Sequence, residues 1–318
     1  MTVTDITIFS HTAAKCGCRE RLIMRVFVTG ASGWIGSAVI AELIEAGHEV
    51  VGLARNDQSA AAIAAAGGQV QRGDITDLDS LRAGADGADG IIHTAYIHDF
   101  SAMENAAAVD FAAVNLFGDL LEGTGKPLVI ASGILGAVSV ETDRIDPEKF
   151  WSPRGLTEAT ELAFAERGIR SSVVRLAPTV HGEGDHGFIA VLAGIDREKG
   201  TAGYVGDGTT RWPAVHRLDA AHLFRIGLED APAGTVLHAI GEEGVRMLDI
   251  AEAIGRQLDI PLQSVAAADA PEHFGWLGAF LAMDSTATSA ITQQKFGWKP
   301  AHPTLLEDLQ AGYYTRAL

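Results

Sequence analysis

The stretch Val28-Thr29-Gly30-Ala31-Ser32-Gly33-Trp34-Ile35-Gly36 decides the fold of this 318-residue chain. A short β-branched run leads into three glycines spaced G-x-x-G-x-x-G, and an apolar helical pattern follows. After a strand, such glycines allow a tight turn, close approach of a ligand and close helix packing, and the helix N-terminus offers N–H donors. We predict that this loop holds a dinucleotide diphosphate; the alternative is a glycine-rich turn without a ligand. The predicted binding residues are Gly30, Ser32, Gly33, Trp34, Ile35 and Gly36.

Strand-like and helical segments alternate along the first half of the chain. The predicted strands are residues 25–29, 48–54, 69–72, 90–94, 127–131 and 171–176. The predicted helices are residues 35–46, 58–66, 76–83 with Thr76 as its cap, 104–121 and 157–167. Alternation of this kind implies right-handed crossovers and one parallel sheet. We therefore predict an α/β fold, a doubly wound parallel sheet with a smaller C-terminal substrate lobe.

The pattern changes after about residue 178, where loops lengthen and short elements carry aromatic residues. We predict a dinucleotide-binding domain over residues 24–180, to which residues 214–230 return as a helix capped by Asp219. Residues 181–213 and 231–318 are predicted to form the substrate lobe.

The first 23 residues differ in composition from the rest, and we expect them to form a flexible extension, with Met24 as the natural start. Cys16-Gly17-Cys18 with His11 has an alternative interpretation as half of a metal site. A structural zinc usually has four ligands in paired spacings, and no further cysteine follows. We therefore predict no metal.

Composition excludes several classes of protein. The net charge of −17 argues against nucleic acid or an acidic membrane as a general partner. No apolar run reaches the ~18 residues of a membrane-spanning helix. Two cysteines exclude a disulfide scaffold and fit a reducing cytoplasm, where we expect the protein.

The end of the second predicted strand sets the cofactor preference. An NAD enzyme usually places Asp or Glu there to hold the ribose hydroxyls, whereas this chain reads Leu53-Ala54-Arg55-Asn56. A guanidinium suits the dianionic 2′-phosphate of NADP, which a carboxylate would repel. Arg55 therefore predicts NADP over NAD, unless its side chain only faces solvent. Asp74 either accepts from the adenine amino group or caps a helix.

Four segments make the chain resemble the short-chain dehydrogenase/reductase superfamily, and within it the extended and atypical branch of epimerase/dehydratase-like proteins. These segments are residues 28–36, 73–77, 174–182 and 206–219. The resemblance covers about residues 24–312 and is specific to the superfamily, not to a substrate. It implies a Rossmann sheet that binds NAD(P), with the active site at the carboxyl ends of the strands.

The resemblance also assigns residues to the cofactor and to catalysis. Those it places at the cofactor are Ile75, Ala95, Tyr96, Pro178 and Val180. Ser132 matches the family's catalytic serine, and Asp110 falls near the place of its asparagine. The resemblance implies a small-molecule substrate. Family members often dimerise, so we also expect a homodimer.

The superfamily's Tyr–Lys pair is missing from its usual place. In that pair, the lysine and the oxidised nicotinamide lower the pKa of the tyrosine, which exchanges a proton with the substrate oxygen. No tyrosine lies between residues 97 and 203, and alignment on Glu161 puts Pro153 and Thr157 at the two positions. Lys149 is the only lysine between residues 127 and 198.

A substitute proton donor must come from another strand end. Tyr96 and His98 follow the fourth predicted strand, and a phenol beside an imidazolium would mimic the Tyr–Lys pair. Alternatively, Tyr96 packs against the cofactor or the core and His98 lies on the surface. His181 and His216 are further candidates at the substrate, because histidine titrates near neutrality.

Arg211 is the main candidate for binding the substrate. In nucleotide-sugar enzymes of this branch, the arginine of this motif binds substrate phosphate, and a structural ion pair is the alternative. Trp212 replaces the usual acidic neighbour, which disfavours a nucleotide sugar. Together with Phe274, Trp276 and Phe280, it indicates a more apolar pocket.

Three functions follow from these patterns. The first is an NADP-dependent oxidoreductase that acts on a small carbonyl or alcohol by hydride transfer with a non-standard proton donor. The second is a catalytically silent NADP-binding sensor or scaffold, in which the cofactor loop persists without a proton relay. The third is a nucleotide-sugar epimerase or dehydratase, which the missing Tyr–Lys pair disfavours most.

Overall fold

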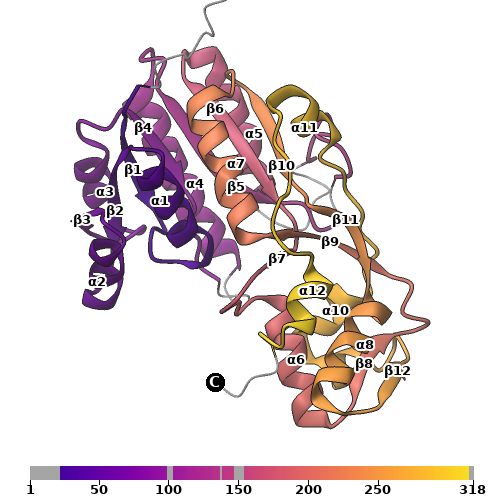
Figure 1. Cartoon of the computed structure of the whole chain (residues 1–318). Helices are drawn as coiled ribbons and strands as arrows, with labels where there is room; N and C mark the ends of the chain where they lie inside the picture. Colours follow the sequence, from indigo (N-terminus) through magenta and orange to yellow (C-terminus); the bar gives the residue numbers. More distant parts are fainter. Residues whose placement is uncertain (1–21, 99–102, 137, 147–153, 315–318) are drawn as a thin grey trace, which may run out of the picture.

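Seven parallel strands form the central sheet of the computed structural model (Figure 1). The structure describes residues 22–98, 103–136, 138–146 and 154–314. The spatial order β10-β6-β5-β4-β1-β2-β3 is that of a doubly wound sheet, so the predicted fold class is confirmed. The strands are β1 (Arg25–Thr29), β2 (Glu49–Ala54), β3 (Gln69–Arg72), β4 (Gly90–His93), β5 (Pro127–Gly133), β6 (Arg170–Leu176) and β10 (Thr235–Ala239).

Helices cover both faces of this sheet. One face packs against α1 (Trp34–Glu45), α2 (Asp57–Ala65) and α7 (Arg217–Asp230). The other packs against α3 (Leu78–Ala85), α4 (Met103–Leu121) and α5 (Arg154–Ala163), which continues as the 3-10 turn η1 (Phe164–Arg167). With both faces covered, the central strands are apolar along their whole length.

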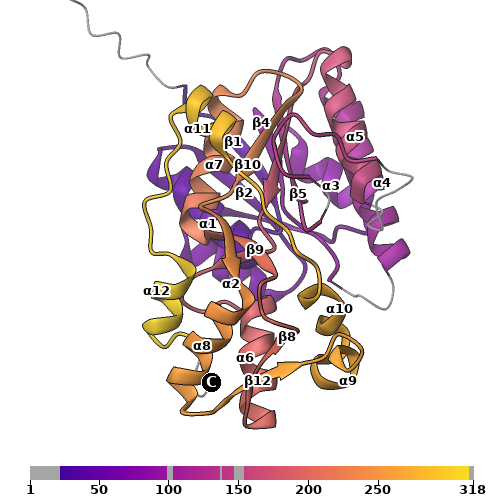
Figure 2. The same ribbon diagram turned by 90° about the vertical axis from the view of Figure 1, so that its right-hand side faces the viewer.

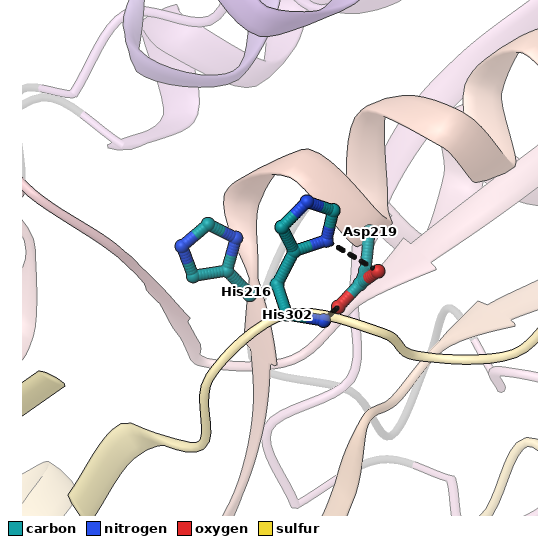
Figure 3. A group of neighbouring side chains, drawn as sticks. All are labelled: His216, Asp219 and His302. Atoms are coloured by element: carbon teal, nitrogen blue, oxygen red, sulfur yellow. Dashed lines mark hydrogen bonds and ion pairs between the residues drawn. The ribbon is translucent and has the colours of Figure 1, made fainter. Parts of the chain in front are cut away.

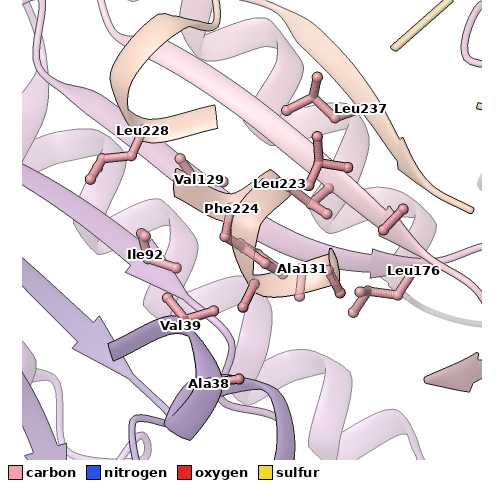
Figure 4. Close-up of a cluster of buried hydrophobic side chains, with 14 of the residues drawn as sticks. Ala38, Val39, Ile92, Val129, Ala131, Leu176, Leu223, Phe224, Leu228 and Leu237 are labelled. Carbon is pink, nitrogen blue, oxygen red and sulfur yellow. The ribbon is translucent and has the colours of Figure 1, made fainter. Parts of the chain in front are cut away.

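Phe224 of α7 lies at the centre of one of these interfaces (Figure 4). Its side chain is fully buried together with Val39 of α1 and with Ile92 and Val129 of the sheet. Burying a phenylalanine stabilises a fold by about 1.5–3 kcal/mol. This cluster holds α1, and with it the loop that precedes α1, against the sheet.

A smaller lobe continues below the carboxyl ends of the strands (Figures 1 and 2). A three-stranded sheet, in the order β11-β9-β7, connects it to the main domain. These strands are β7 (Thr179–His181), β9 (Arg211–His216) and β11 (Glu242–Arg246). The lobe itself has a parallel pair, β8 (Ala202–Val205) and β12 (Leu262–Val265), and a separate apolar core. Its helices are α6 (Phe188–Lys199), α8 (Met247–Leu258), α9 (Ala270–Phe274), η2 (Gly275–Leu277), α10 (Gly278–Leu281) and α12 (Leu305–Gln310).

The structure corrects the predicted lobe boundary. Residues 231–318 were assigned to the lobe, but β10 pairs with β6 as an edge strand of the main sheet. Further along, α11 (Ala290–Phe296) also belongs beside this strand, because the Thr292 hydroxyl accepts from His238 N at 2.9 Å. The lobe is therefore built from three stretches, separated by the return of α7 and β10 to the sheet and by α11.

Two predicted helix caps are also wrong. The α3 helix is capped by Asp77, whose carboxylate accepts from Asp79 N at 3.1 Å, and not by Thr76. The α7 helix begins two residues before Asp219 and is capped by the His216 ring. Asp219 faces a later segment instead, as described below. No helix among the described residues is long and apolar enough to span a bilayer.

A buried ion pair fixes α5 to the sheet. Arg175 of β6 is fully buried and donates to the Glu158 carboxylate of α5 from Nε at 3.0 Å and from Nη2 at 2.6 Å. The same guanidinium also donates to the carbonyl of Asp143 at 2.9 Å. A buried charge is tolerated only when it is paired in this way. The helix α5 is consequently held against the carboxyl-terminal part of β6.

Asp196 carries the lobe's clearest pH-dependent contribution to stability. It lies fully buried on α6, where it accepts from Gly203 N of β8 at 3.0 Å, and burial raises its pKa to about 7. Because the folded pKa exceeds the unfolded value, the folded state binds the extra proton. The contribution of Asp196 to the free energy of unfolding is therefore fully present below pH ~4 and is lost as pH rises through about 7.

We therefore predict that Asp196→Asn, which resembles the protonated carboxyl, becomes more stable relative to the unmodified protein as pH rises. The gain between pH 5 and pH 8 should be on the order of 2 kcal/mol, in thermal or urea unfolding at both pH values. A stability difference between the two proteins that is independent of pH would contradict this assignment.

Candidate active site

A cleft of about 880 Å³ lies between the sheet and the lobe, outside the carboxyl ends of β1, β2 and β4. The strand order reverses there, which is where doubly wound folds bind ligands. The sheet side is lined by residues that include Gly30, Ser32, Gly33, Trp34, Ile35, Gly36, Arg55, Asp74, Ile75, Ala95, Tyr96 and His98. The lobe side is lined by His186, Gly187, Phe188, Val191 and Trp276.

The glycine loop has the geometry of a diphosphate cradle. Gly30 has a φ of +68°, and Gly33 N donates to its carbonyl at 2.8 Å, which closes the turn. A Cβ at Gly36 would lie only 2.0 Å from the Gly30 carbonyl oxygen, so only glycine lets α1 pack this closely. Among the described residues, no side chain caps α1 and no acidic residue occupies its first turn. Its N–H groups and partial positive charge therefore suit an anion.

Trp34, in the first turn of α1, connects this loop to the lobe side. Its Nε1 donates to the Val180 carbonyl at 2.8 Å, and the Arg217 guanidinium lies 4.2 Å from its ring centroid. The His186 ring approaches edge-on, with 5.7 Å between centroids. Thus one side chain of the cradle also holds β7 and α7 in place.

Arg55 lies beyond β2, exposed, at one end of the cleft. The neighbouring Asn56 is occupied as the cap of α2, and Asp57 forms an ion pair with Arg72. Asp74 also lines the cleft, and its carboxylate accepts from the backbone and hydroxyl of Thr76. These two hydrogen bonds lower the pKa of Asp74, as does the charge of Arg55, so it is ionised at neutral pH.

Tyr96 lies at the other end, after β4, and its partner is an arginine. The Arg154 guanidinium carbon lies 4.2 Å from the Tyr96 ring centroid, which is cation–π distance. Burial raises the pKa of the Tyr96 phenol, while the charge of Arg154 acts in the opposite direction. A cation is thus present beside the phenol.

His98 is adjacent but is not that cation. Its ring centroid lies 5.5 Å from that of Tyr96. Partial desolvation and then the charge of Arg154 lower the pKa of His98, so it is neutral at pH 7. The predicted phenol–imidazolium pair is therefore corrected to a phenol–guanidinium pair.

Ser132 and Asp110 do not line the cleft. Both are almost fully buried, Ser132 in β5 and Asp110 in α4, where it pairs with His93. Neither is placed to contact a substrate, which corrects their predicted catalytic roles. Pro178 and Val180 are half-buried beside the cleft rather than among its lining residues, and Val180 contributes its carbonyl to Trp34.

The predicted substrate residues Arg211 and Trp212 also have other roles. Arg211 donates to Asp284 from Nε at 3.2 Å and from Nη2 at 3.0 Å, in a shallow depression separate from the cleft. The alternative of a structural ion pair is therefore the correct one. Trp212 is fully buried in the core of the lobe and donates to the Met283 carbonyl at 3.1 Å.

His181 and His216 belong to a cluster behind the cleft. His181 is buried and bonded to Asp308 at 2.6 Å, and the His216 ring lies 5.4 Å from the His181 ring. Neither lines the cleft among the described residues, so their predicted contact with substrate is wrong. Burial, reinforced by the charge of His181, lowers the pKa of His216 to about 4.

The same cluster contains three side chains close enough to share a metal ion, His216, Asp219 and His302 (Figure 3). Asp219 accepts instead from Ala301 N at 3.0 Å and from His302 Nδ1 at 2.8 Å. The two imidazoles are stacked, with an interplanar angle of 12°. Ring lone pairs lie in the ring planes, and the planes of two stacked rings with centroids 4.9 Å apart do not meet near either ring, so the two imidazoles cannot both aim at one ion. The cluster therefore fits a clamp on the C-terminal segment better than a metal site.

Sequence reasoning missed Arg154, and Phe188 with it. Arg154 directly follows Pro153, which is aligned with the family's tyrosine. Pro153 and Lys149 both lie outside the described residues. Thr157, aligned with the lysine, is buried. A search for any cation at the start of this helix would have found Arg154. Phe188 lines the cleft only because the lobe folds back toward the sheet, and no local sequence pattern indicated this.

Comparisons with known proteins agree with this geometry. The sequence model of the NAD dependent epimerase/dehydratase family matches residues 26–122. A protein of Schizosaccharomyces pombe, described only as uncharacterized, is 46% identical over 92% of this chain and 100% of its own length. A similarly described protein of Saccharomyces cerevisiae is 43% identical over 91% of this chain and 99% of its own. The crystal structure of Thermus thermophilus UDP-glucose 4-epimerase in complex with NAD superimposes with a TM-score of 0.69, at 18% identity, over 93% of this chain and 100% of that one.

We predict that Gly36→Ala disrupts the cradle, because its Cβ would meet the Gly30 carbonyl at 2.0 Å and force α1 away from the turn. Affinity for a nicotinamide dinucleotide, measured by calorimetry with both NADPH and NADH, should fall at least about tenfold, since the diphosphate loses aligned N–H donors. The matched control is Gly194→Ala in α6, where an added Cβ would meet no atom within 4 Å. Unchanged affinity in a folded Gly36→Ala protein would contradict the cradle.

Proposed function

The chain belongs to the NAD-dependent epimerase/dehydratase family of the short-chain dehydrogenase/reductase superfamily, and we propose that it is an NADP-dependent oxidoreductase acting on small apolar carbonyls. One observation carries the proposal: a single cleft has Arg55 at one end, the glycine cradle in the middle and Tyr96 at the other. A dinucleotide laid across the cradle reaches both ends. Bound there, the nicotinamide would supply or accept hydride.

Arg55 supports NADP over NAD. Its guanidinium is exposed beside the cleft, and among the described residues no carboxylate from the end of β2 lines it. The nearest acid after that strand, Asp57, is paired with Arg72. A 2′-phosphate would find a fork of donors there, and Asp74 is the one carboxylate among the residues that line the cleft.

Tyr96 is the proposed proton donor. Its ring lines the cleft from the carboxyl end of β4, and burial raises the pKa of its phenol, so it carries its proton at neutral pH. During reduction it would give that proton to the carbonyl oxygen as hydride reaches the carbonyl carbon. In the reverse direction it would accept the proton of an alcohol.

Aromatic side chains of the lobe support an apolar substrate. Phe188 and Trp276 line the cleft, with 5.7 Å between their ring centroids, and the Phe280 ring lies 5.6 Å from Phe188. Trp276 is 45% exposed, so a substrate has a broad apolar surface to cover. The arginine expected to hold a sugar nucleotide, Arg211, is paired elsewhere, which disfavours the epimerase alternative.

The direct experiment is a panel of aliphatic and aromatic aldehydes and ketones, with NADPH oxidation followed by absorbance. Turnover that favours the more apolar carbonyls is expected. Tight NADPH binding without oxidation of any of them would support the sensor or scaffold instead. The homodimer and the cytoplasmic location stay predictions.

Arg55→Ala tests the cofactor preference. The variant should lose about tenfold or more in affinity for NADPH, because a charge-assisted contact to the 2′-phosphate disappears, and little for NADH. Calorimetry with both nucleotides measures this, and Arg82→Ala on the exposed face of α3 is the control. Equal affinities for the two nucleotides in the unmodified protein would refute the role of Arg55.

Tyr96→Phe tests the proton donor. It removes only the hydroxyl, so we expect kcat for an accepted carbonyl to fall about 10²–10⁴-fold while NADPH affinity stays within about twofold. Steady-state kinetics and calorimetry on the same preparation separate the two effects. Tyr204→Phe, in β8 outside the cleft lining, is the matched control. Turnover that survives in Tyr96→Phe would assign the proton to another group.

A further inference from the structure

The guanidinium of Arg154, which lies over the Tyr96 ring, is held in position by several contacts. Arg154 opens α5, the helix that the Glu158–Arg175 ion pair holds to β6. Its Nη2 donates to the Ala131 carbonyl in β5 at 2.6 Å, and its side chain is 20% exposed. The guanidinium therefore spans from the end of β5 to the Tyr96 ring after β4.

A buried carboxylate lies on the other side of the same guanidinium. Asp110 Oδ2 is 3.8 Å from Arg154 Nε, and the Asp110 side chain is only 2% exposed. Burial alone would raise the pKa of Asp110, but the hydrogen bond from His93 and the charge of Arg154 hold it below its usual value. Asp110 is thus an anion that requires Arg154 as its counter-ion.

His93 extends the chain to the first strand. Its Nε2 lies 3.2 Å from Asp110 Oδ1, and its Nδ1 lies 2.7 Å from the Thr29 hydroxyl. With Asp110 ionised, an imidazole protonated at Nε2 donates to the carboxylate and accepts from Thr29. Thr29 directly precedes Gly30, so a continuous polar chain runs beneath the cradle from Thr29 to Tyr96.

We infer that Arg154, oriented by Asp110 and His93, is the positioning residue that makes Tyr96 an effective proton donor. This inference rests on the proposed function. The family's pair takes both members from the helix that follows the fifth strand. Here the phenol comes from the end of β4, and only the cation comes from that helix. The arrangement supplies a relay that Ser132 and His98 do not.

The chemistry balances with NADPH as the reductant. The carbonyl carbon gains hydride, which oxidises NADPH to NADP⁺, while the bond between the Tyr96 oxygen and its proton breaks and the carbonyl oxygen gains that proton. The products are an alcohol and a Tyr96 phenolate. The positive charge of Arg154 stabilises this phenolate until water at the cleft mouth returns a proton.

The groups that face Tyr96 predict the direction of each charge effect. Arg154 from α5 favours the phenolate, whereas Asp110 from α4 opposes it. His98, which follows β4, is neutral at pH 7 and contributes no charge there, and His186 of the lobe lies next to it. Removal of Arg154 therefore removes the charge that favours the phenolate.

The first test needs no substrate. The protein is labelled with 3-fluorotyrosine, whose phenol ionises at lower pH than tyrosine, and each ¹⁹F resonance is titrated. The Tyr96 signal is identified as the one missing from Tyr96→Phe. We expect Arg154→Gln to raise the pKa of this phenol by about one unit or more, a tenfold change in its ionisation constant, since the positive charge 4.2 Å from the ring centroid is lost. Arg154→Lys should restore most of it, and Arg82→Gln should change nothing.

The second test uses a carbonyl that the unmodified protein reduces. Arg154→Gln should lower kcat at least about 10²-fold with NADPH affinity within about twofold, and Arg154→Lys should recover part of the rate. Asp110→Asn should lower kcat with the same unchanged affinity. An unshifted Tyr96 titration, or full kcat in folded Arg154→Gln, would overturn the inference.

The two proposals fail in distinguishable ways. If the protein binds NADPH but reduces no carbonyl, the proposed function fails, while the fluorotyrosine titration still reports whether Arg154 controls the Tyr96 phenol. If carbonyls are reduced and Arg154→Gln is fully active, the proposed function holds and the role of Arg154 is lost. A purely structural Arg154 would lower the melting temperature without a selective shift of the Tyr96 resonance.

Discussion

The contact between Gly36 and the carbonyl of Gly30 is the constraint on which the rest of the molecule depends. An approach this close, with no room for a Cβ, brings the N-terminus of α1 directly over the end of β1. The same turn places Trp34 against β7 and α7, so the lobe begins at a fixed position relative to the sheet. Cofactor cradle, sheet and lobe thus share a single short turn, and a disturbance there reaches all three.

Parallel sheets make it easy for a catalytic group to change its place in the sequence. The carboxyl ends of neighbouring strands converge on one edge, so a side chain after β4 and another after β5 reach the same volume. Tyr96 and Arg154 illustrate this, because their contact brings together two segments with α4 and β5 between them in the sequence. In our proposal, the buried Asp110 orients the Arg154 guanidinium toward Tyr96, although Asp110 itself is not among the residues that line the cleft.

The strands, the helices and the glycine cradle were predictable because their signals are local: apolar periodicity and glycine spacing need only a few neighbouring residues. Arg55 was singled out in the same way, and it lines the cleft, while its preference for NADP stays a prediction. The contacts that define the rest of the site are long-range. Arg211 carries a family motif, yet its carboxylate partner Asp284 lies 73 residues further on, and no local pattern announces it. Asp219 resembles a helix cap, but its partners are Ala301 and His302. Strand β10 was not predicted although it is as long as β1, and its pairing with β6 identifies it as part of the main sheet.

The positions of the tryptophans have a practical consequence. Trp34 and Trp276 both line the cleft, whereas Trp212 and Trp298 are fully buried in apolar cores. Indole emits light at wavelengths that a dihydronicotinamide absorbs, so two intrinsic fluorophores of this chain lie where a reduced coenzyme would quench them. Intrinsic tryptophan fluorescence would therefore report occupancy of the cleft without a label, from one indole on the cradle and one on the lobe.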